Sequence, residues 1–259
     1  MDIKNIIRQF VREIAVDPWQ PIYRRKLLGS RKFHGWDARL DGYFWPRPGV
    51  DRHATKVALD PLIGLIQPLA HTARLGTPWD ARQRADACRA ANLIFHWGRV
   101  PQRPETITPE NIRAVILAAV RDDRNSSAPM NSGWTKVAAL ATAQSDNPHV
   151  IWDSRVSNSI VRRLDNWFHE CGITRIPTSV DKIGIVTGQG GTRRELTRHL
   201  DWPIAYGRWS SQVAASEFVR RVCAEVNTGV CPDTNEPWSD MRDLWTVREI
   251  EMVLFMDGY

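Results

Sequence analysis

Apolar residues recur at helical spacing along most of this chain. After Asp2, the segment IKNIIRQFVREIA repeats large apolar residues every three or four positions, which predicts an amphipathic helix. The same pattern predicts helices at about 55–75, 78–97, from 108, at Lys136, from Asp153 to about 170, and at about 209–227 and 245–256. No convincing run of alternating residues predicts a sheet. The fold class is therefore expected to be mainly α.

Two of these helices have clear start signals. Thr77 precedes Pro78, and Thr108 precedes Pro109, so each pair combines a capping hydroxyl with a proline at the first helical position. The polar stretch 121–131 then ends the helix that begins at 108. These start and stop signals set the expected boundaries of the helices.

Residues 17–53 differ from the rest, because they are basic, aromatic and interrupted by proline and glycine. The residues that give this character are Pro18, Trp19, Pro21, Arg24, Arg25, Lys26, Gly29, Arg31, Lys32, Gly35, Trp36, Arg39, Tyr43, Trp45, Pro46 and Pro48. Such a stretch predicts loop with short strands or turns. It is either a long surface loop or a wall that faces nucleic acid or substrate, and long loops in compact domains are often functional.

We expect two parts along the chain. Residues 1–105 hold the N-terminal helices and the basic aromatic segment, and residues 106–259 hold a core that carries the chemistry. A chain of 259 residues is long enough to bury a full core as one domain or as two small lobes.

Composition narrows the function classes. Hydrophobic residues make up 42% and charged residues 25%, which is ordinary for a soluble globular protein. The net charge of +6 fits a polyanionic partner and equally fits a mildly basic enzyme. No apolar run spans a membrane and no signal peptide is evident, so a cytosolic protein is expected.

The cysteines and tryptophans bear on redox state and packing. Cys88, Cys171, Cys223 and Cys231 form no CxxC pair, so neither a zinc site nor a disulfide framework is indicated. The twelve tryptophans are many for this length, and most are expected in the core. The glycine-rich stretch 188–194, GQGGTRR, lacks the spacing of a phosphate-binding P-loop and is interpreted as an ordinary loop.

Lys136 and Asp153 stand at two successive helix starts. Asp153 follows the apolar run 150–152, and a carboxylate at a helix N-terminus accepts backbone N–H groups and stays ionised. Lys136 lies at a helix start, where a cation is electrostatically misplaced. This indicates either that its ammonium group is needed elsewhere or that its amine serves as a nucleophile. Taken alone, the aspartate is an ordinary N-cap and the lysine an ordinary solvated side chain.

The order of these parts resembles that of the helix-hairpin-helix DNA glycosylases. Residues 135–138 read TKVA against GTKVA in the 8-oxoguanine glycosylase branch, and residues 150–155 read VIWDSR against VPVDVH. Residues 249–255, EIEMVLF, match a segment of the form WAQAVLF. The resemblance covers about residues 108–256 and implies a two-lobed helical fold of the helix-hairpin-helix type, preceded by the basic loop segment.

The resemblance also implies roles for individual residues. Lys136 is expected to attack the sugar C1′, and Asp153 to stabilise the oxocarbenium-like sugar and activate the nucleophile. Arg155 occupies the place of a histidine that contacts phosphate. Glu251 stands where the family has a base-reading glutamine, and Phe255 where it has a phenylalanine that stacks on the base. An ionised glutamate accepts from an exocyclic amine such as cytosine N4.

The hairpin departs from the family pattern. The family has LPGVG, whose backbone N–H groups bind phosphate, whereas this chain has MNSGW over residues 130–134. By position, Gly133 and Thr135 are expected to contact the DNA backbone and Trp134 the base. No four-cysteine pattern follows, which disfavours the iron–sulfur branches. Neither a cofactor nor a metal ion is expected.

The expected partner is double-stranded DNA that contains a modified base, bound by a monomer in the nucleoid. Glu251, the altered hairpin and the aromatic segment favour a bulky glucosylated hydroxymethylcytosine of phage DNA, hence antiphage defence. An 8-oxoguanine-type repair glycosylase with lyase activity is the first alternative, and glycosylase-like proteins of other phage-defence systems are another. A DNA-binding protein without catalysis, and a nuclease or helical scaffold, are alternatives of other classes.

Overall fold

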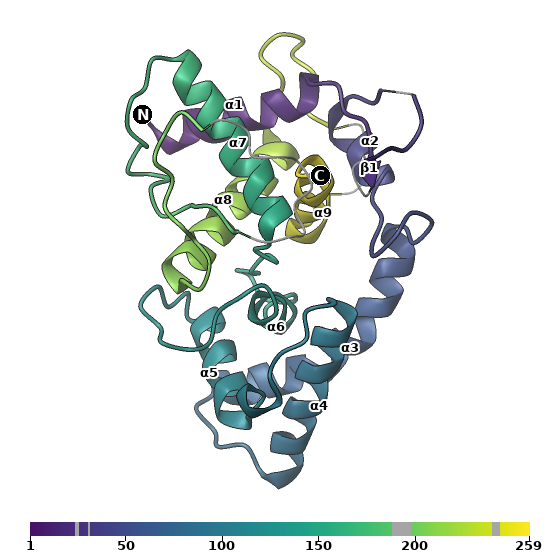
Figure 1. Ribbon diagram of the computed structural model, residues 1–259, viewed down its shortest axis with the longest axis vertical. Coiled ribbons are helices and arrows are strands. Elements are labelled where there is room, and N and C mark those ends of the chain that lie inside the picture. The colour runs from purple at the N-terminus through teal and green to yellow at the C-terminus, as the bar shows by residue number, and fades with distance from the viewer. Residues whose placement is uncertain (24–25, 31, 188–197, 240–243) are drawn as a thin grey trace. The chain divides into compact units, whose positions relative to one another are not determined.

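Helices dominate the computed structural model, which describes residues 1–23, 26–30, 32–187, 198–239 and 244–259 (Figure 1). The strands of this described part are β1 (Ile22–Tyr23) and β2 (Lys26–Leu27), an antiparallel pair in which Ile22 lies opposite Leu27. The prediction of a mainly α fold is therefore confirmed.

The described residues form the following helices in chain order. They are α1 (Ile3–Val16), α2 (Gly35–Asp41), α3 (Arg52–Arg74), α4 (Ala81–Trp97), the 3-10 helix η1 (Pro104–Thr106), α5 (Pro109–Val120), α6 (Trp134–Ala141), α7 (Ser154–Glu170), α8 (Trp209–Thr228) and α9 (Val247–Asp257).

Most predicted helices are confirmed, and two details are wrong. Helix α4 begins at Ala81, because Asp80 and Gln83 form a capping box that replaces the predicted start at Thr77 and Pro78. The seven residues of α2 lie inside the segment that was expected to hold only loop, short strands and turns. Helix α5 does begin as predicted, with the Thr108 hydroxyl accepting from Asn111 N at 3.2 Å.

Residue contacts divide the chain into two compact units. Unit 1 comprises Met1–Thr55, Asp153–Ile204 and Glu217–Tyr259, and unit 2 comprises Lys56–Trp152 and Ala205–Ser216. The boundary expected between residues 105 and 106 falls inside unit 2. Helices on both sides of that point share one hydrophobic core, in which α4 packs on α5 and on α6.

Unit 1 is built around the pairing of α7 with α9. Helix α2 also packs on α9, and α1 packs on both α2 and α7. The apolar face of α1 supplies Phe10, whose ring meets Phe218 edge to face at a centroid distance of 5.1 Å. The prediction of an amphipathic helix after Asp2 is thereby confirmed.

A buried cluster of ion pairs joins these helices around Asp257, the last residue of α9. Arg163 donates to both Asp257 oxygens, at 2.9 and 2.8 Å, and the Ser159 hydroxyl donates at 2.7 Å. Arg162 and Arg39 add further ion pairs at 3.2 and 3.5 Å. The arginines hold the pKa of the Asp257 carboxyl well below its usual value, against the opposing effect of complete burial.

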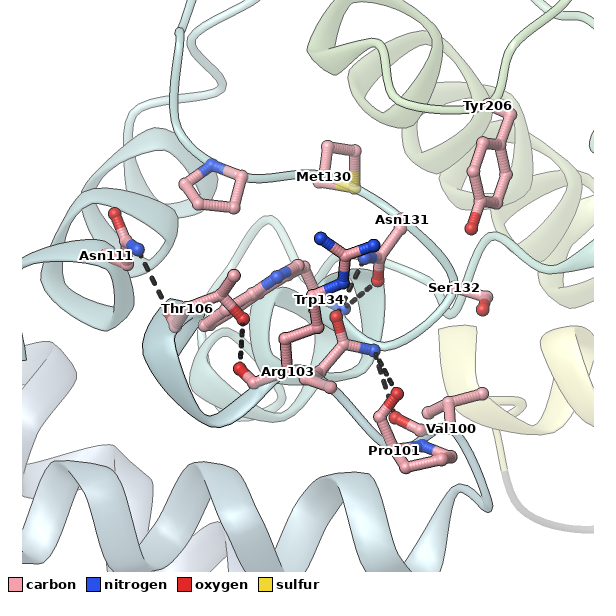
Figure 2. A pocket seen from close by; sticks show the side chains of 12 residues that line it. Val100, Pro101, Arg103, Thr106, Asn111, Met130, Asn131, Ser132, Trp134 and Tyr206 are labelled. Carbon is pink, nitrogen blue, oxygen red and sulfur yellow. Dashed lines mark hydrogen bonds between the residues drawn. The ribbon is translucent and has the colours of Figure 1, made fainter. Parts of the chain in front are cut away.

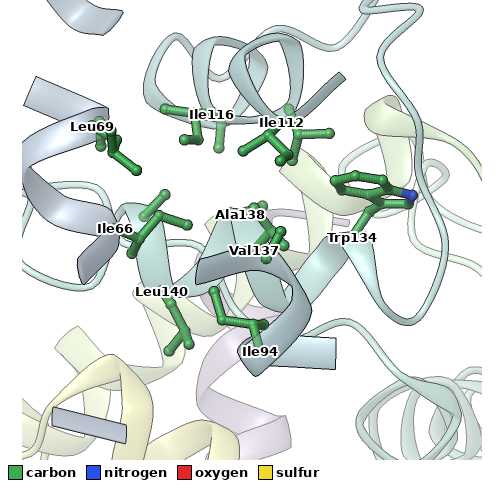
Figure 3. Packing of buried hydrophobic residues seen from close by; sticks show 14 of the residues in the cluster. Ile66, Leu69, Ile94, Ile112, Ile116, Trp134, Val137, Ala138 and Leu140 are labelled. Carbon is green, nitrogen blue, oxygen red and sulfur yellow. The ribbon is translucent and has the colours of Figure 1, made fainter. Parts of the chain in front are cut away.

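Helix α6 contributes to the hydrophobic core of unit 2. Every residue of α6 is buried, and its apolar residues Val137, Ala138 and Leu140 face the large residues of α3, α4 and α5 (Figure 3). Those residues include Ile66 and Leu69 from α3, Ile94 from α4, and Ile112 and Ile116 from α5. Burial of a Leu or Ile side chain stabilises by about 1.5–3 kcal/mol, so this packing holds α6 firmly in unit 2.

The aromatic side chains of segment 17–53 are mostly part of the core of unit 1. Trp19, Trp36, Tyr43 and Phe44 are each at most 5% exposed. The indole N–H of Trp36 donates to the Val11 carbonyl oxygen at 3.2 Å. This part of the segment is therefore neither an exposed loop nor an open aromatic wall. Of the basic residues named for it, Arg24, Arg25 and Arg31 lie outside the described residues.

Helix α3 has 23 residues and an outer face that is polar in its first half. Lys56 and Asp60 are both exposed and form an ion pair at 2.8 Å. Pro61 and Pro68 stand within the helix, where each removes one backbone hydrogen bond. Across the described residues, no helix combines the length and the apolar character that crossing a membrane requires.

Candidate functional site

Lys136 is a buried lysine in the first turn of an otherwise uncharged helix. Its residue is 5% exposed, and Nζ donates to the Ser132 carbonyl oxygen at 2.7 Å. Gly98 leaves space for the lysine side chain, since a Cβ at that position would lie 2.4 Å from Lys136 Cδ. A lysine is rarely buried without a specific purpose, because taking an ammonium ion out of water is costly.

The turn before α6 is closed by the side chain of Asn131. Its Oδ1 accepts from Gly133 N at 2.8 Å and from Trp134 N at 3.1 Å, while its amide donates to Gln102 Oε1 at 2.8 Å. The backbone N–H groups that a glycine-rich hairpin offers to phosphate are thus used internally at these two residues. The predicted phosphate contact at Gly133 gains no support from this geometry.

Thr135 is an internal residue of unit 2. Its hydroxyl bonds to Gln212 Oε1 at 2.7 Å and to the Val150 carbonyl oxygen at 3.2 Å, and it accepts from Trp152 N at 2.8 Å. The residue is 1% exposed. Thr135 ties the 150–152 segment to α6, so the structure assigns it a positioning task and gives no exposed group for the predicted DNA contact.

Trp134 packs in the hydrophobic core of unit 2. It is 1% exposed, and its ring meets Phe95 edge to face with centroids 5.0 Å apart. The predicted base contact requires an exposed ring face, whereas the ring of Trp134 is buried. Its packing on Phe95 anchors the first residue of α6 to α4.

Asp153 caps α7 with one of its two oxygens. Oδ1 accepts from Arg155 N at 2.9 Å and from Val156 N at 3.1 Å. Oδ2 lies 3.9 Å from an Arg155 guanidinium nitrogen, too far for a hydrogen bond. The residue is 9% exposed. One carboxylate oxygen is therefore fixed by the helix, and the other has no hydrogen bond within the described part of the chain.

Arg155 lies in a cluster of aromatic rings in unit 1. Its guanidinium carbon is 4.3 Å from the ring centre of Tyr259, 4.7 Å from Phe255 and 5.6 Å from Trp45. These are cation–π distances. Gly258 lets the end of α9 approach the backbone of Arg155, because a Cβ there would lie 1.9 Å from the Arg155 carbonyl oxygen. The side chain predicted to contact phosphate is thus stacked on the ring predicted to hold the base.

Glu251 lies one helical turn before Phe255 on α9 and is 4% exposed. Arg248, three residues earlier, donates a hydrogen bond to its carboxylate. Nearby Tyr43 is 5% exposed, and burial raises the pKa of its hydroxyl to about 12 while Arg248 opposes the shift. The base-reading carboxylate expected at Glu251 is therefore buried and already paired.

The predicted site residues separate into two groups. Asp153, Arg155, Glu251 and Phe255 belong to unit 1, where contacts join Arg155 to both Asp153 and Phe255. Gly133, Trp134, Thr135 and Lys136 are consecutive residues of unit 2. The sequence reasoning missed Tyr259, Arg248 and Trp45 as neighbours of these residues. Helical spacing from Phe255 and Glu251 was a usable signal for the first two.

Unit 2 also contains a pocket of about 600 Å³ beside the turn that precedes α6 (Figure 2). Residues 100–103, residues 129–132 and Tyr206 supply most of its lining. Ser132, whose carbonyl oxygen holds Lys136, is one of these residues.

A serine, a histidine and an aspartate line up in unit 2 without the exposure that catalysis needs. His149 has one ring nitrogen 3.3 Å from the Ser216 hydroxyl and the other 2.8 Å from Asp122. Ser216 is fully buried, and its hydroxyl donates to the Gln212 carbonyl oxygen at 2.8 Å. A nucleophilic serine must reach substrate, so this array is structural.

In comparisons with known proteins, no family model, no curated protein and no solved structure matches the chain. Among the described residues, no group of three or more histidine, cysteine, aspartate or glutamate side chains is arranged to hold a metal ion. The glycine-rich stretch interpreted as an ordinary loop, residues 188–194, lies outside the described residues.

Proposed function

We propose that this protein is a DNA N-glycosylase of the helix-hairpin-helix type, in which Lys136 and Asp153 act on the sugar of a flipped-out base. The observation that carries the proposal is the state of Asp153. It is a buried carboxylate with one oxygen fixed by a helix start and the other without a hydrogen bond inside the described chain. A fixed anion of this kind stabilises positive charge that develops on a sugar ring.

The connection between the two residues adds support. Asp153 follows Trp152 in the chain, and the N–H of Trp152 is bound to the hydroxyl of Thr135. Thr135 is in turn the neighbour of Lys136. This hydrogen bond, inside unit 2, holds the residue that precedes Asp153 against the residue that precedes Lys136.

The arrangement of α5 and α6 is the second support. These helices pack against each other and are joined by residues 121–133, the last part of which forms the turn with Met130, Asn131 and Ser132. In a glycine-rich hairpin, the first N–H groups of the second helix are free to bind phosphate. Here the N–H groups of Gly133 and Trp134 donate to the Asn131 side chain instead. In the proposal, this turn holds Lys136 in place through the Ser132 carbonyl oxygen.

The proposed reaction breaks the bond between C1′ and the base nitrogen. As the base leaves with the electron pair, Asp153 stabilises the oxocarbenium-like sugar, and the neutral amine of Lys136 forms a bond to C1′. The proton lost by the amine passes through Asp153 to the departing base. The sugar ring then opens to give an imine with Lys136. Hydrolysis of the imine frees the amine, either directly or after β-elimination has cleaved the strand at C3′.

The favoured substrate is DNA that carries glucosylated hydroxymethylcytosine, which would make the enzyme an antiphage protein. Glu251 is a hydrogen-bond acceptor of the kind that suits a cytosine amine, although Arg248 now holds it. A base that reaches Phe255 either displaces the Arg155 guanidinium or stacks on it, and guanidinium planes stack on bases as aromatic rings do.

The experiment is release of free base, followed by mass spectrometry. The substrates are phage DNA with glucosylated hydroxymethylcytosine, an 8-oxoguanine duplex and an unmodified duplex of the same length. We expect release of the glucosylated base by the wild type and none by Asp153→Asn. Release from the 8-oxoguanine duplex alone would move the function to base excision repair. Binding to all three duplexes without release of base would indicate a DNA-binding protein without catalytic activity.

A further inference from the structure

The pocket in unit 2 is lined by neither Lys136 nor Asp153, the residues of the proposed reaction. It measures about 600 Å³, within the range that holds small molecules in proteins. Figure 2 shows Arg103, Ser132 and Tyr206 around it, with Trp134 behind the turn. The chemistry of its lining indicates what it binds.

The three side-chain amides of the pocket wall, from Gln102, Asn111 and Asn131, are used inside the protein, and Asn111 donates to the Thr106 carbonyl oxygen at 2.9 Å. Asn131 donates to Gln102 Oε1 at 2.8 Å, and Gln102 donates to the Val100 carbonyl oxygen at 3.0 Å. Asn131 Oδ1 accepts from the two N–H groups that begin α6. These amides therefore give the wall a fixed shape and have little capacity left for a ligand.

Three other polar groups remain available to a ligand. Within the described part of the chain, no internal partner is found for the guanidinium of Arg103 or for the hydroxyls of Ser132 and Tyr206. Arg103 is exposed, and Tyr206 is 45% exposed. All three donate hydrogen bonds, and one of them carries a permanent positive charge.

Among the described residues, the lining includes no acidic side chain that would neutralise that charge. Its members are Val100, Pro101, Gln102, Arg103, Thr106, Asn111, Pro129, Met130, Asn131, Ser132, Trp134 and Tyr206. A site that combines a guanidinium, two hydroxyl donors and no carboxylate favours an anion that is rich in acceptor oxygens. Phosphate has this character, and a carboxylate has it to a lesser degree because it offers fewer acceptor oxygens.

The rest of the lining suits a flat, partly apolar body. Val100, Pro101, Pro129 and Met130 present apolar surface, and the Tyr206 ring is half exposed beside them. A phosphate ion alone fills a small part of the volume. A phosphate attached to a nucleoside fills much more of it and offers a ring that stacks on tyrosine.

We infer that this pocket binds a nucleotide, with its phosphate at Arg103 and at the hydroxyls of Ser132 and Tyr206, and with its sugar and base against the apolar lining. The nucleotide is either a free monophosphate or one unit of a nucleic acid strand. This inference goes beyond the proposed reaction and does not depend on it.

One consequence links the pocket to Lys136. The Ser132 residue whose hydroxyl faces a ligand also holds Lys136 Nζ through its carbonyl oxygen at 2.7 Å. A nucleotide bound there fixes the turn and with it the position of the amine. If the proposed function holds, occupancy of the pocket should therefore change the rate of the lysine reaction.

Isothermal titration of the full-length protein tests the binding. The probes are deoxythymidine monophosphate, deoxythymidine, inorganic phosphate and a single-stranded tetrathymidylate. We expect binding of the monophosphate or the oligonucleotide, at least about tenfold weaker binding of deoxythymidine, and weaker binding of inorganic phosphate than of either nucleotide. Binding of the oligonucleotide alone identifies a strand as the source, and binding of the monophosphate at equal strength identifies the free nucleotide.

Matched variants locate the bound nucleotide. Arg103→Gln should weaken binding at least about tenfold. Arg82→Gln removes the same charge from an α4 side chain that is 92% exposed and outside the pocket, and should change affinity less than about twofold. Tyr206→Ala should weaken the binding of the nucleotides more than the binding of inorganic phosphate. Both arginines are exposed, so thermal melting should verify folding in each variant.

Three results would overturn the inference. The first is the absence of wild-type binding to every nucleotide probe at millimolar concentration. The second is an equal loss in Arg103→Gln and Arg82→Gln, which reports general charge attraction. The third is inorganic phosphate binding as tightly as the nucleotides, which reports an anion site without a nucleoside subsite. Base release measured separately distinguishes any of these from a failure of the proposed reaction.

Discussion

Two buried aspartates of unit 1, Asp257 and Asp153, differ in how many of their oxygens the protein uses. Asp257 ends α9 and receives hydrogen bonds on both oxygens, from Arg163, Arg162 and Ser159. Asp153 precedes α7 and receives hydrogen bonds on one oxygen, from two backbone N–H groups. Both are at most 9% exposed.

The number of bonded oxygens distinguishes a buried carboxylate that stabilises the fold from one that is placed to act on a ligand. A carboxylate that is saturated by arginines is stable in place, and removing it leaves charges buried without a partner. A carboxylate held on one side keeps its orientation through the helix start and leaves its second oxygen to act on a ligand. Their neighbouring arginines differ in the same way. Arg163 is fixed by Asp257 and by Asp17, whereas Arg155 is stacked on rings.

The largest expected effect is the loss of base release in Asp153→Asn. We expect a fall of at least about 10³-fold, equivalent to about 4 kcal/mol, because the amide cannot stabilise positive charge on the sugar. Asparagine caps helices as well as aspartate does, so thermal melting should change little. Binding to the same duplex should persist, as gel shift will measure. A large drop in melting temperature would make Asp153 structural and remove the contrast with Asp257.

Asp257→Asn should have the opposite profile and cost stability. Breaking a buried ion pair by removing one partner costs about 3–5 kcal/mol, and here three arginines lose their shared anion. Urea unfolding measures the effect. The control is Asp233→Asn, since Asp233 pairs with Arg12 on the surface at 2.7 Å and its removal should cost less than about 1 kcal/mol. Equal costs would mean that the buried cluster contributes nothing special.

Glu13 sharpens the comparison through pH, because it lies at the edge of the Asp257 cluster, 3.7 Å from Arg163. Burial raises the pKa of its carboxyl from 4.5 to about 7, and the nearby arginine only partly offsets this. The folded state therefore binds a proton that the unfolded state releases between these values, so this contribution to stability is full below 4.5 and is lost as pH rises to about 7.

Glu13→Gln should accordingly remove the pH-dependent loss. The variant is expected to be more stable than wild type at pH 8 by about 1–3 kcal/mol, with little difference at pH 4. Gln9 donates to the Glu13 carboxylate at 3.4 Å, and an amide oxygen keeps that bond. Denaturant unfolding at both pH values measures it. Glu236→Gln, at an exposed position, should leave the pH dependence as in wild type.

The smallest expected effect concerns the stacked arginine. Arg155→Gln should lower the free energy of unfolding by about 1 kcal/mol, because three cation–π contacts are lost. The control is Arg52→Gln, whose side chain is 42% exposed and pairs with Asp41 only at 3.8 Å. Chemical denaturation of both variants decides the comparison. A loss above about 3 kcal/mol would place Arg155 with the structural arginines.

The helices were predictable where local rules govern them. Asp153 was expected as the cap of α7, and Thr108 as the cap of α5, because a capping side chain and its N–H groups are close in sequence. The start of α4 was misjudged because the Asp80 box competes with the Thr77 signal, and sequence alone does not rank them. The burial of most tryptophans was expected from their size and is confirmed.

The contacts of the candidate site were less predictable, because they depend on tertiary packing. Arg162 and Arg163 follow each other on α7, and nothing local indicates that Arg163 is buried against α9. Thr135 was expected at the DNA and proves to be internal, since its partners come from residues 150, 152 and 212. The stacking of Arg155 on Phe255 likewise joins two helices that are far apart in sequence.

Covalent trapping of Lys136 tests the central claim most directly. The wild-type protein is incubated with phage DNA that carries glucosylated hydroxymethylcytosine in the presence of borohydride, and the adduct is mapped by peptide mass spectrometry. The account predicts a reduced sugar adduct on Lys136, absent in Lys136→Gln and strongly reduced in Asp153→Asn. Base release with an adduct on another lysine, or with none, would contradict the role of Lys136.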